Sequence, residues 1–472
     1  MTDNNQNPQQ KRRIPVRKTA VSTGNKQPVR QPKQPDNPEL LYSQTVGKEG
    51  PVLEQDSILH ESLETLVHSK IVERPLHVKG TGAFGYFETL NSMSEYTKLP
   101  FLQQAGTTVP VAVRFSLGAS NKGTPDTLRN VRGFSTKFYT DDGIFDLICN
   151  HIPIFSLRDP RRFAESVEVM SPSPKNNLMD PNRVWEFVAT TPESINFFVQ
   201  LYSDHGTIKS LRRIPGHSVS TYVWRNAQGK RHYIKYLWVP FDGVEYITNE
   251  EAEKLAAMNP DYAAEDLFQT IAGGESVEYG LYVQILDPED AEKLPFDPLD
   301  DTKVWDEELL PFHPVGKMVL NRNPDNYMEQ VEKIAFSPSN LLDGAELSFD
   351  KILQGRSNIY WDSQRYRIGP QFRKVPINDQ KHWQPDDLQT SGEGEFVEGR
   401  LVRSDIPKAK QDDFSQAGEF YQSLSPTGKS HLVSNLVAAL TGVRRDLQTK
   451  VIEYLSLASP ELGKRVSEGL RQ

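Results

Sequence analysis

Short runs in which apolar and polar residues alternate dominate the chain between residues 71 and 320. These runs are 111–117, 132–140, 145–157, 220–226, 232–240 and 278–286. Alternation with a period of two, rich in β-branched and aromatic residues, is typical of strands. Sharp turns at 141–143 (Asp-Asp-Gly) and 227–229 (Ala-Gln-Gly) fit hairpins between neighbouring runs. The pattern predicts an antiparallel barrel or sandwich and argues against a parallel sheet of βαβ units.

Apolar positions with helical spacing replace this alternation over 181–203 and 249–258, and they dominate from 411 to the end. Between 321 and 410 the chain is rich in proline, asparagine and glycine with little regular pattern, which is typical of a segment that wraps around something. We therefore expect an α+β protein in four parts. They are an N-terminal arm (1–70), an antiparallel β-barrel domain (71–320), a wrapping segment (321–410) and a C-terminal helical region (411–472).

Composition narrows the class of protein. The 472 residues include no apolar run long enough to span a bilayer, and the start of the chain lacks the apolar core of a signal peptide. The single cysteine, Cys149, excludes an internal disulfide, a C-x-x-C metal site and a c-type haem attachment. We therefore expect a cytoplasmic protein. A net charge of −9 predicts that its body repels nucleic acid.

The first 35 residues differ from the rest of the arm. They hold eight basic residues against the single acid Asp3, and they contain almost nothing apolar. Such a segment cannot offset its own ordering entropy by burial, so we expect it to be disordered. A solvated or subunit-embracing arm is favoured over a tail that binds polyanions.

A literal G-x-G-x-x-G occurs at Gly80, Gly82 and Gly85. In dinucleotide-binding folds this spacing follows a strand and opens a helix. The residues after Gly85 do not read as a helix start, and the surrounding strands are expected to be antiparallel. The sequence therefore argues against a nucleotide site at these glycines.

Longer stretches point to another class of site. The chain from about residue 40 to its end resembles the haem-containing monofunctional catalases of the small-subunit type. The stretches that carry the likeness are RPLHVKGTGAFGYFE (74–88), VAVRFS (111–116), RGFSTKFYTDDG (132–143), NRNPDNYMEQVEKIAFSPSNL (321–341) and LQGRSNIYWDSQRYRIGPQF (353–372). The resemblance implies haem b, a homotetramer, and dismutation of hydrogen peroxide through a ferryl intermediate.

On the distal side of the haem, the resemblance makes His77 the group that accepts and returns the peroxide proton. Histidine suits this role because its imidazole exchanges protons near neutral pH. Asn150 matches the residue that orients peroxide, and Ser116 the partner that fixes the imidazole. The glycines after His77 then form a close backbone turn beneath it.

On the proximal side, Tyr360 matches the family's iron ligand. At about 100° per residue, Arg356, Tyr360 and Arg367 fall on one face of a helix, where Arg356 can donate to the phenolate. Arg74, Arg114 and Arg367 match the propionate-binding positions, for which guanidinium groups are suited. In the same way, Phe155 and Phe163 match the apolar and stacking positions of the distal side.

Departures from the family pattern cluster near the distal site. They are Leu76 before the histidine, Asn130 in place of a channel aspartate, and Cys149 and His151 around Asn150. We expect low turnover at low peroxide concentration and a gain from Asn130→Asp. The alternatives are that Asp126 supplies the missing charge or that Asn130 satisfies local hydrogen bonds.

Two further departures concern NADPH, which some small-subunit catalases bind. This chain has His205 where an arginine is usual and Glu307 where a histidine is usual. Because an acid beside phosphates is unfavourable, we expect no tight NADPH binding. The rival functions are a peroxidase or hydroperoxide-converting haem enzyme on the same fold, and a haem-binding protein without activity.

Overall fold

The structure is a computed structural model that describes residues 42–379 and 412–471, and these residues form two units, 42–73 and 74–379 with 412–471. The first unit contains helix α1 (Ser57–Val67), which begins after Asp56. The Asp56 carboxylate accepts a hydrogen bond from the Leu59 amide at 3.0 Å, as expected of a residue that caps a helix. The basic residues 1–35 and the part of the wrapping segment over 380–410 lie outside the described residues.

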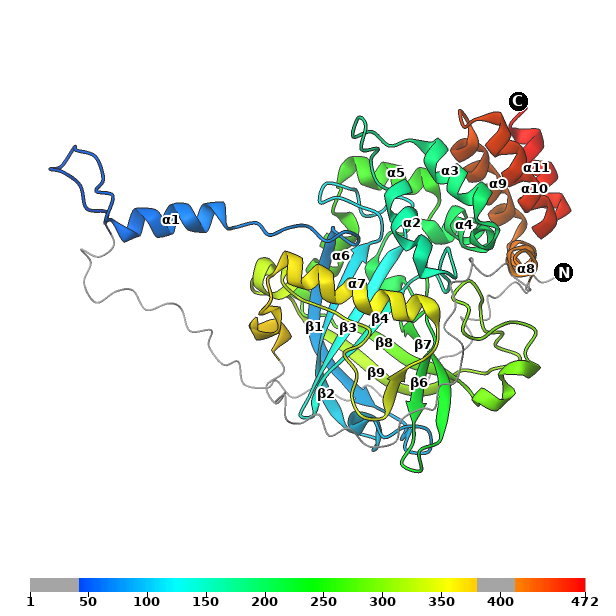
Figure 1. Cartoon of the computed structure of the whole chain (residues 1–472), viewed down its shortest axis with the longest axis horizontal. Coiled ribbons are helices and arrows are strands. Elements are labelled where there is room, and N and C mark those ends of the chain that lie inside the picture. Colours follow the sequence, from blue (N-terminus) through cyan, green and yellow to red (C-terminus); the bar gives the residue numbers. More distant parts are fainter. Residues whose placement is uncertain (1–41, 380–411, 472) are drawn as a thin grey trace. The chain divides into compact units, whose positions relative to one another are not determined.

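A closed antiparallel barrel forms the centre of the second unit (Figure 1). The strands of the described chain are β1 (Gly80–Thr89), β2 (Thr108–Leu117), β3 (Arg132–Thr140), β4 (Gly143–Asn150), β5 (Gly216–His217), β6 (Tyr222–Arg225), β7 (Arg231–Pro240), β8 (Val277–Leu286), β9 (His313–Arg322) and β10 (Ala345–Leu347). Pairing runs β1-β2-β3-β4-β5-β7-β8-β9 and returns to β1, while β6 pairs with β7 and β10. The predicted α+β barrel is confirmed.

Strand β2 shows why the barrel strands are almost continuously apolar. Val111, Val113 and Phe115 point into the barrel and belong to its main apolar core, whereas Ala112 and Arg114 lie on the outer face. Both faces are buried, so the alternation of apolar and polar residues is incomplete. Each fully buried phenylalanine stabilises the fold by about 1.5–3 kcal/mol.

Within the second unit, a layer of helices packs against one side of the barrel. Its helices are α2 (Phe163–Val169), α3 (Pro181–Thr190), α4 (Ile195–Tyr202), α5 (Asn249–Met258), α6 (Tyr262–Ala272), α8 (Ser415–Ser423), α9 (Pro426–Leu440), α10 (Arg445–Ala458) and α11 (Pro460–Gly469). The C-terminal helices share an apolar core with α3 and α4, beside which Figure 1 shows them. No helix in the described ranges is long and apolar enough to cross a membrane.

Helix α7 (Lys351–Arg367) lies across the outer face of β1 to β4 (Figure 1). The segment that leads to it is tied to the barrel through Asp146, whose Oδ1 lies 2.7 Å from Lys137 Nζ in a buried ion pair. The other Asp146 oxygen accepts from the Ser337 amide at 2.9 Å and from Asn340 Nδ2 at 2.7 Å. Removing one member of such a pair costs about 3–5 kcal/mol, and removing Asp146 would also break the contacts with residues 337–340.

The structure corrects three local expectations. The glycines at 80–85 belong to strand β1 and form no turn. The helix expected over 181–203 is interrupted at Pro192, because proline cannot donate the hydrogen bond that would continue it. The described part of the irregular segment contains the end of β9, strand β10 and helix α7.

Candidate active site

The site is built on a row of residues that crosses the outer face of four strands. The ladder pairs Gly80 with Ser116, Ser116 with Gly133, and Gly133 with Asn150. Glycine alternates with a polar side chain along this row, so the surface is hollowed at Gly133. A Cβ atom there would lie 2.6 Å from Ser116 Oγ and 2.8 Å from His77 Nδ1. The glycine therefore makes the space that the imidazole occupies.

His77 precedes β1 and has the unusual backbone φ of 59°. Its amide donates to the Gly118 carbonyl at 2.8 Å, and its Nδ1 lies 3.0 Å from Ser116 Oγ. A left-handed φ is strained for a residue with a side chain, so these contacts hold the imidazole at a local cost. Burial, together with the nearby guanidinium groups of Arg114 and Arg356, lowers the pKa of His77 to about 3. The ring is therefore neutral at physiological pH.

Asn150 ends strand β4 and lies on the same outer face as Ile148, two residues earlier. Its side-chain amide has no hydrogen-bond partner among the described residues, so both N–H groups are available. The predicted distal residues His77, Ser116 and Asn150 are thus gathered around one ladder row.

Helix α7 carries Arg356 and Tyr360 one turn apart, as predicted. The Arg356 guanidinium carbon lies 5.8 Å from the centre of the Tyr360 ring. Burial alone would lower the pKa of Arg356, but the phenols of Tyr360 and Tyr222 raise it above its ordinary value. The Tyr360 ring packs against the apolar cluster on the outer barrel face that contains Ile148.

Three buried guanidinium groups surround one carboxylate near the C-terminal end of α7. Arg74 Nη1 and Arg367 Nη2 each lie 3.2 Å from Glu332 Oε1. Arg114 donates to the Val78 carbonyl at 3.1 Å, but its Nε is buried without a partner among the described residues. Burial lowers the pKa of all three guanidinium groups. Arg74 and Arg367 share this carboxylate, and Arg114 forms no ion pair among the described residues.

This donor set fits a cofactor with two carboxylates, as haem has. A haem propionate could supply the acceptor that Arg114 Nε lacks, and both propionates would add negative charge beside the three guanidinium groups. The apolar residues of the outer face and the Tyr360 ring suit the flat body of such a group. The residues present therefore fit haem.

Phe155 and Phe163 follow strand β4. Their rings lie parallel, at an angle of 1°, with centres 5.8 Å apart. Both side chains are half-buried, and the Phe155 amide donates to the Asp301 carbonyl at 2.8 Å. The two predicted aromatic positions are therefore brought together.

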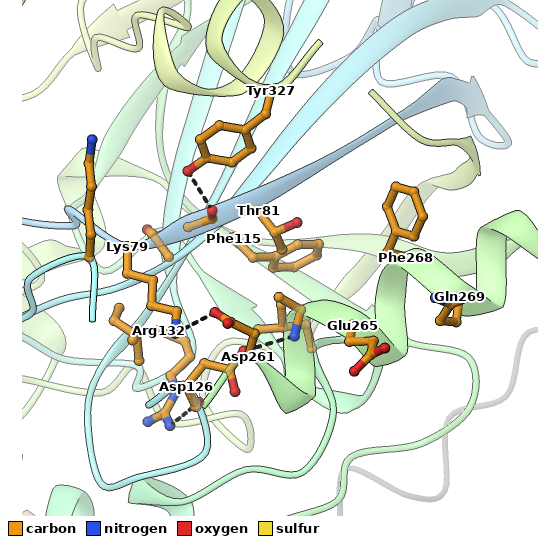
Figure 2. A pocket seen from close by; sticks show the side chains of 16 residues that line it. Lys79, Thr81, Phe115, Asp126, Arg132, Asp261, Glu265, Phe268, Gln269 and Tyr327 are labelled. Carbon is orange, nitrogen blue, oxygen red and sulfur yellow. Dashed lines mark hydrogen bonds and ion pairs between the residues drawn. The ribbon is translucent and has the colours of Figure 1, made fainter. Parts of the chain in front are cut away.

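A cavity of about 520 Å³ lies beside this site (Figure 2). It is lined by residues from the start of β1, the end of β2 and helix α6, and it touches the row described above through Gly80 and Ser116. Figure 2 shows Lys79 and Asp261 reaching toward each other; their charged atoms lie 2.7 Å apart. Tyr327 donates to the Gly80 carbonyl at 3.0 Å.

The Asn130 side chain forms hydrogen bonds with the backbone of Ala119. Its amide donates to the Ala119 carbonyl at 2.7 Å, and its Oδ1 accepts from the Ala119 amide at 3.2 Å. Asp126 is also engaged, because its carboxylate accepts from the amides of Ala263 and Ala264 at the start of α6. These contacts favour the alternative in which Asn130 satisfies local hydrogen bonds over a missing channel charge.

His151 is likewise used within the fold. Its Nδ1 accepts from the Arg132 amide at 2.9 Å, and its Nε2 lies 2.8 Å from the His205 carbonyl. The side chain thus extends the β3–β4 pairing and joins it to the segment around His205.

Sequence reasoning missed Gly133 and Glu332 as parts of the site. Gly133 could have been found from the predicted strands, since pairing 111–117 with 132–140 sets it opposite Ser116. Glu332 gave no such signal, because its contact with Arg74 joins residues 258 positions apart.

Comparisons with known proteins agree with this geometry. The family described as "Catalase" matches residues 34–401, and that described as "Catalase-related immune-responsive" matches residues 407–470. The chain is 36% identical to a catalase of Listeria seeligeri over 455 residues, covering 90% of this chain and 93% of the relative. It is 37% identical to a catalase of Methanosarcina barkeri, covering 91% of each.

Solved structures show the same fold. A bacterial catalase superimposes with a TM-score of 0.85 at 33% identity, covering 94% of this chain and 97% of the other. Catalase A from Saccharomyces cerevisiae gives a TM-score of 0.82 at 32% identity, covering 96% and 98%.

Proposed function

The chain belongs to the catalase family and dismutes hydrogen peroxide to water and dioxygen, and we propose that it does so with haem b held between α7 and the outer face of the barrel. The phenolate of Tyr360 binds the iron, and Arg356 stabilises that phenolate from one turn away. Arg74, Arg114 and Arg367 hold the propionates. The three guanidinium groups gathered near Glu332, one of them with an unpartnered Nε, support this orientation.

Haem iron, when bound, would supply the redox chemistry of the reaction with each of the two peroxide molecules. The protein supplies the proton transfer. We assign the His77 tautomer in which Nδ1 donates to Ser116 Oγ, because it leaves the Nε2 lone pair free to accept a proton. The neutral imidazole can then take a proton from one peroxide oxygen and return it to the other.

Asn150 orients the peroxide by donating its unpaired side-chain N–H groups to a peroxide oxygen. Phe155 and Phe163 form an apolar wall that limits water at the distal side. The observation that carries this proposal is the ladder row in which Gly133 opens space for His77 between Ser116 and Asn150.

The test is oxygen evolution from haem-loaded protein supplied with peroxide, measured beside oxidation of a one-electron donor. A catalase releases one dioxygen for every two peroxides without a donor. Donor oxidation without dioxygen would identify a peroxidase, and neither reaction in haem-loaded protein would identify a haem-binding protein without activity.

The remaining expectations concern assembly and location. We propose a homotetramer of small subunits in the cytoplasm, whose body does not bind nucleic acid. We also propose that it does not bind NADPH tightly. His205 stacks on Tyr246 at 4.3 Å, and burial lowers the pKa of His205 to about 4, so this position offers no positive charge to a phosphate. Glu307 places a negative charge at the position where a histidine is usual in relatives that bind NADPH.

A further inference from the structure

A buried polar chain continues from Arg356 away from Tyr360. Arg356 Nη1 donates to Ser220 Oγ at 3.0 Å, and Ser220 Oγ lies 2.7 Å from Asp301 Oδ2. Arginine can only donate, so the serine oxygen must accept from Arg356 and its single proton must point to Asp301. The direction of each hydrogen bond from Arg356 to Asp301 is thereby fixed.

The chain ends at two carboxyl groups that interact with each other, those of Asp301 and Asp350. Both side chains are fully buried, with 1% and 0% of their surface exposed. Asp350 caps the N-terminus of α7, and its two oxygens accept from the amides of Leu353 at 3.1 Å and Thr221 at 3.0 Å. Asp301 Oδ1, in contrast, has no donor among the described residues.

A proton on Asp301 removes both the repulsion between the two carboxylates and the missing hydrogen bond of Asp301 Oδ1. Two ionised carboxylates in a buried site repel each other, and an unpaired buried oxygen costs free energy. If Asp301 carries the proton, it donates to Asp350, and the ionised Asp350 then accepts three hydrogen bonds. Burial and the charge of Asp350 raise the pKa of Asp301 well above its ordinary value, which agrees with this arrangement.

Two other charged groups lie near Asp301, and the charge of Lys235 offsets only part of the rise in the pKa of Asp301. Lys235 Nζ donates to the Val219 carbonyl at 2.6 Å, and burial lowers its pKa. The neighbouring Asp300 is paired with Arg158 at 2.8 Å. The remaining nearby cation, Arg356, reaches Asp301 only through Ser220.

We propose that Asp301 is a positioning residue, which holds one proton between itself and Asp350 and fixes Arg356 against Tyr360 through Ser220. The positioning role rests on the proposed function, because Tyr360 must bind iron for it to matter. The proton shared by Asp301 and Asp350 does not depend on the proposed function. Asp301→Asn should preserve both hydrogen bonds, since an amide can accept from Ser220 and donate to Asp350 as the protonated acid does. Asp350→Asn should be damaging, because an amide cannot accept all three donors.

The pH dependence of stability follows from the sign of the shift. The folded protein keeps this proton above the pH at which the unfolded chain releases it, so stability falls as pH rises through that interval. The unfolding constant of the wild-type protein should therefore rise tenfold per pH unit relative to that of Asp301→Asn across the interval.

The experiment compares the full-length wild-type protein with Asp301→Asn, Asp301→Ala and the control Asp306→Asn, which alters an exposed carboxylate in the same segment. At neutral pH, the infrared carbonyl band of one protonated carboxyl group should disappear in both Asp301 variants and persist in the control. In haem-loaded protein, Asp301→Ala should shift the ligand-to-iron charge-transfer band, whereas Asp301→Asn should not.

An infrared spectrum unchanged in Asp301→Asn, or an equal pH slope of unfolding, would overturn the shared proton. A haem spectrum unchanged in Asp301→Ala would overturn the positioning role. Failure of the proposed function would show differently, as a wild-type protein that binds no haem, and the infrared measurement would still decide the state of Asp301.

Discussion

Replacement of Gly133 by alanine tests whether the hollow in the ladder row positions His77. The added Cβ would lie 2.8 Å from His77 Nδ1, 2.9 Å from its Cε1 and 2.6 Å from Ser116 Oγ. To restore an ordinary contact of 3.4 Å, the imidazole must move by about 0.6 Å. Misplacing a reacting group by about 1 Å can cost 10²-fold in rate, so we expect turnover per haem to fall by about 10–100-fold.

The assay is the initial rate of oxygen evolution, normalised to haem content, alongside thermal unfolding. Overpacking of this kind costs about 1–3 kcal/mol, so the variant should still fold and bind haem. Gly123→Ala is the matched control, because its new Cβ has no neighbour closer than 3.5 Å. Wild-type turnover per haem in Gly133→Ala would refute the view that this glycine makes room for the catalytic base.

Four further predictions concern the two sides of the haem. Tyr360→Phe should lose haem or change its charge-transfer bands, and an unaltered spectrum at full haem content would remove Tyr360 as the ligand. His77→Ala should bind haem but react with peroxide on the order of 10²–10⁴ times more slowly, as measured by stopped-flow absorbance. Asn150→Ala should lose less of this rate, because Asn150 transfers no proton. A larger loss in Asn150→Ala than in His77→Ala would show that His77 is not the base. Because burial and nearby arginines lower the pKa of His77 to about 3, turnover per haem should stay flat between pH 5 and 8, where an ordinary histidine titrates. The same pKa shift makes the protein less stable in acid. The unfolded histidine gains its proton near pH 6.5 and the folded one only near 3, so stability is lost as pH falls across that interval. Proton uptake on unfolding would measure this loss.

The strands could be predicted from sequence because their signal is local. The run 132–140 and the helix 249–258 coincide with β3 and α5, and the turn at Gly143 joins β3 to β4 as expected. Strand β1 was missed because its glycines carry no β-strand preference. They are required by close packing, since a Cβ at Gly82 would lie 2.9 Å from Val331 Cγ2.

Only part of the site could be predicted, because only some of its residues are related by local spacing along the chain. The helical spacing of Arg356 and Tyr360 is a local property and is present in α7. The contacts of Glu332 with Arg74 and of Ser220 with Asp301 join residues far apart in the chain. No periodicity marks such pairs, because tertiary packing alone brings them together.

The central claim is that haem lies between α7 and the outer face of the barrel, with Tyr360 on its iron. A crystal structure of the haem-loaded protein, measured at the iron absorption edge, tests this directly. We expect one anomalous iron peak at bonding distance from Tyr360 Oη, with His77 and Asn150 on the opposite face of the porphyrin. An iron peak bound to any other side chain, or haem lodged elsewhere on the barrel, would contradict it.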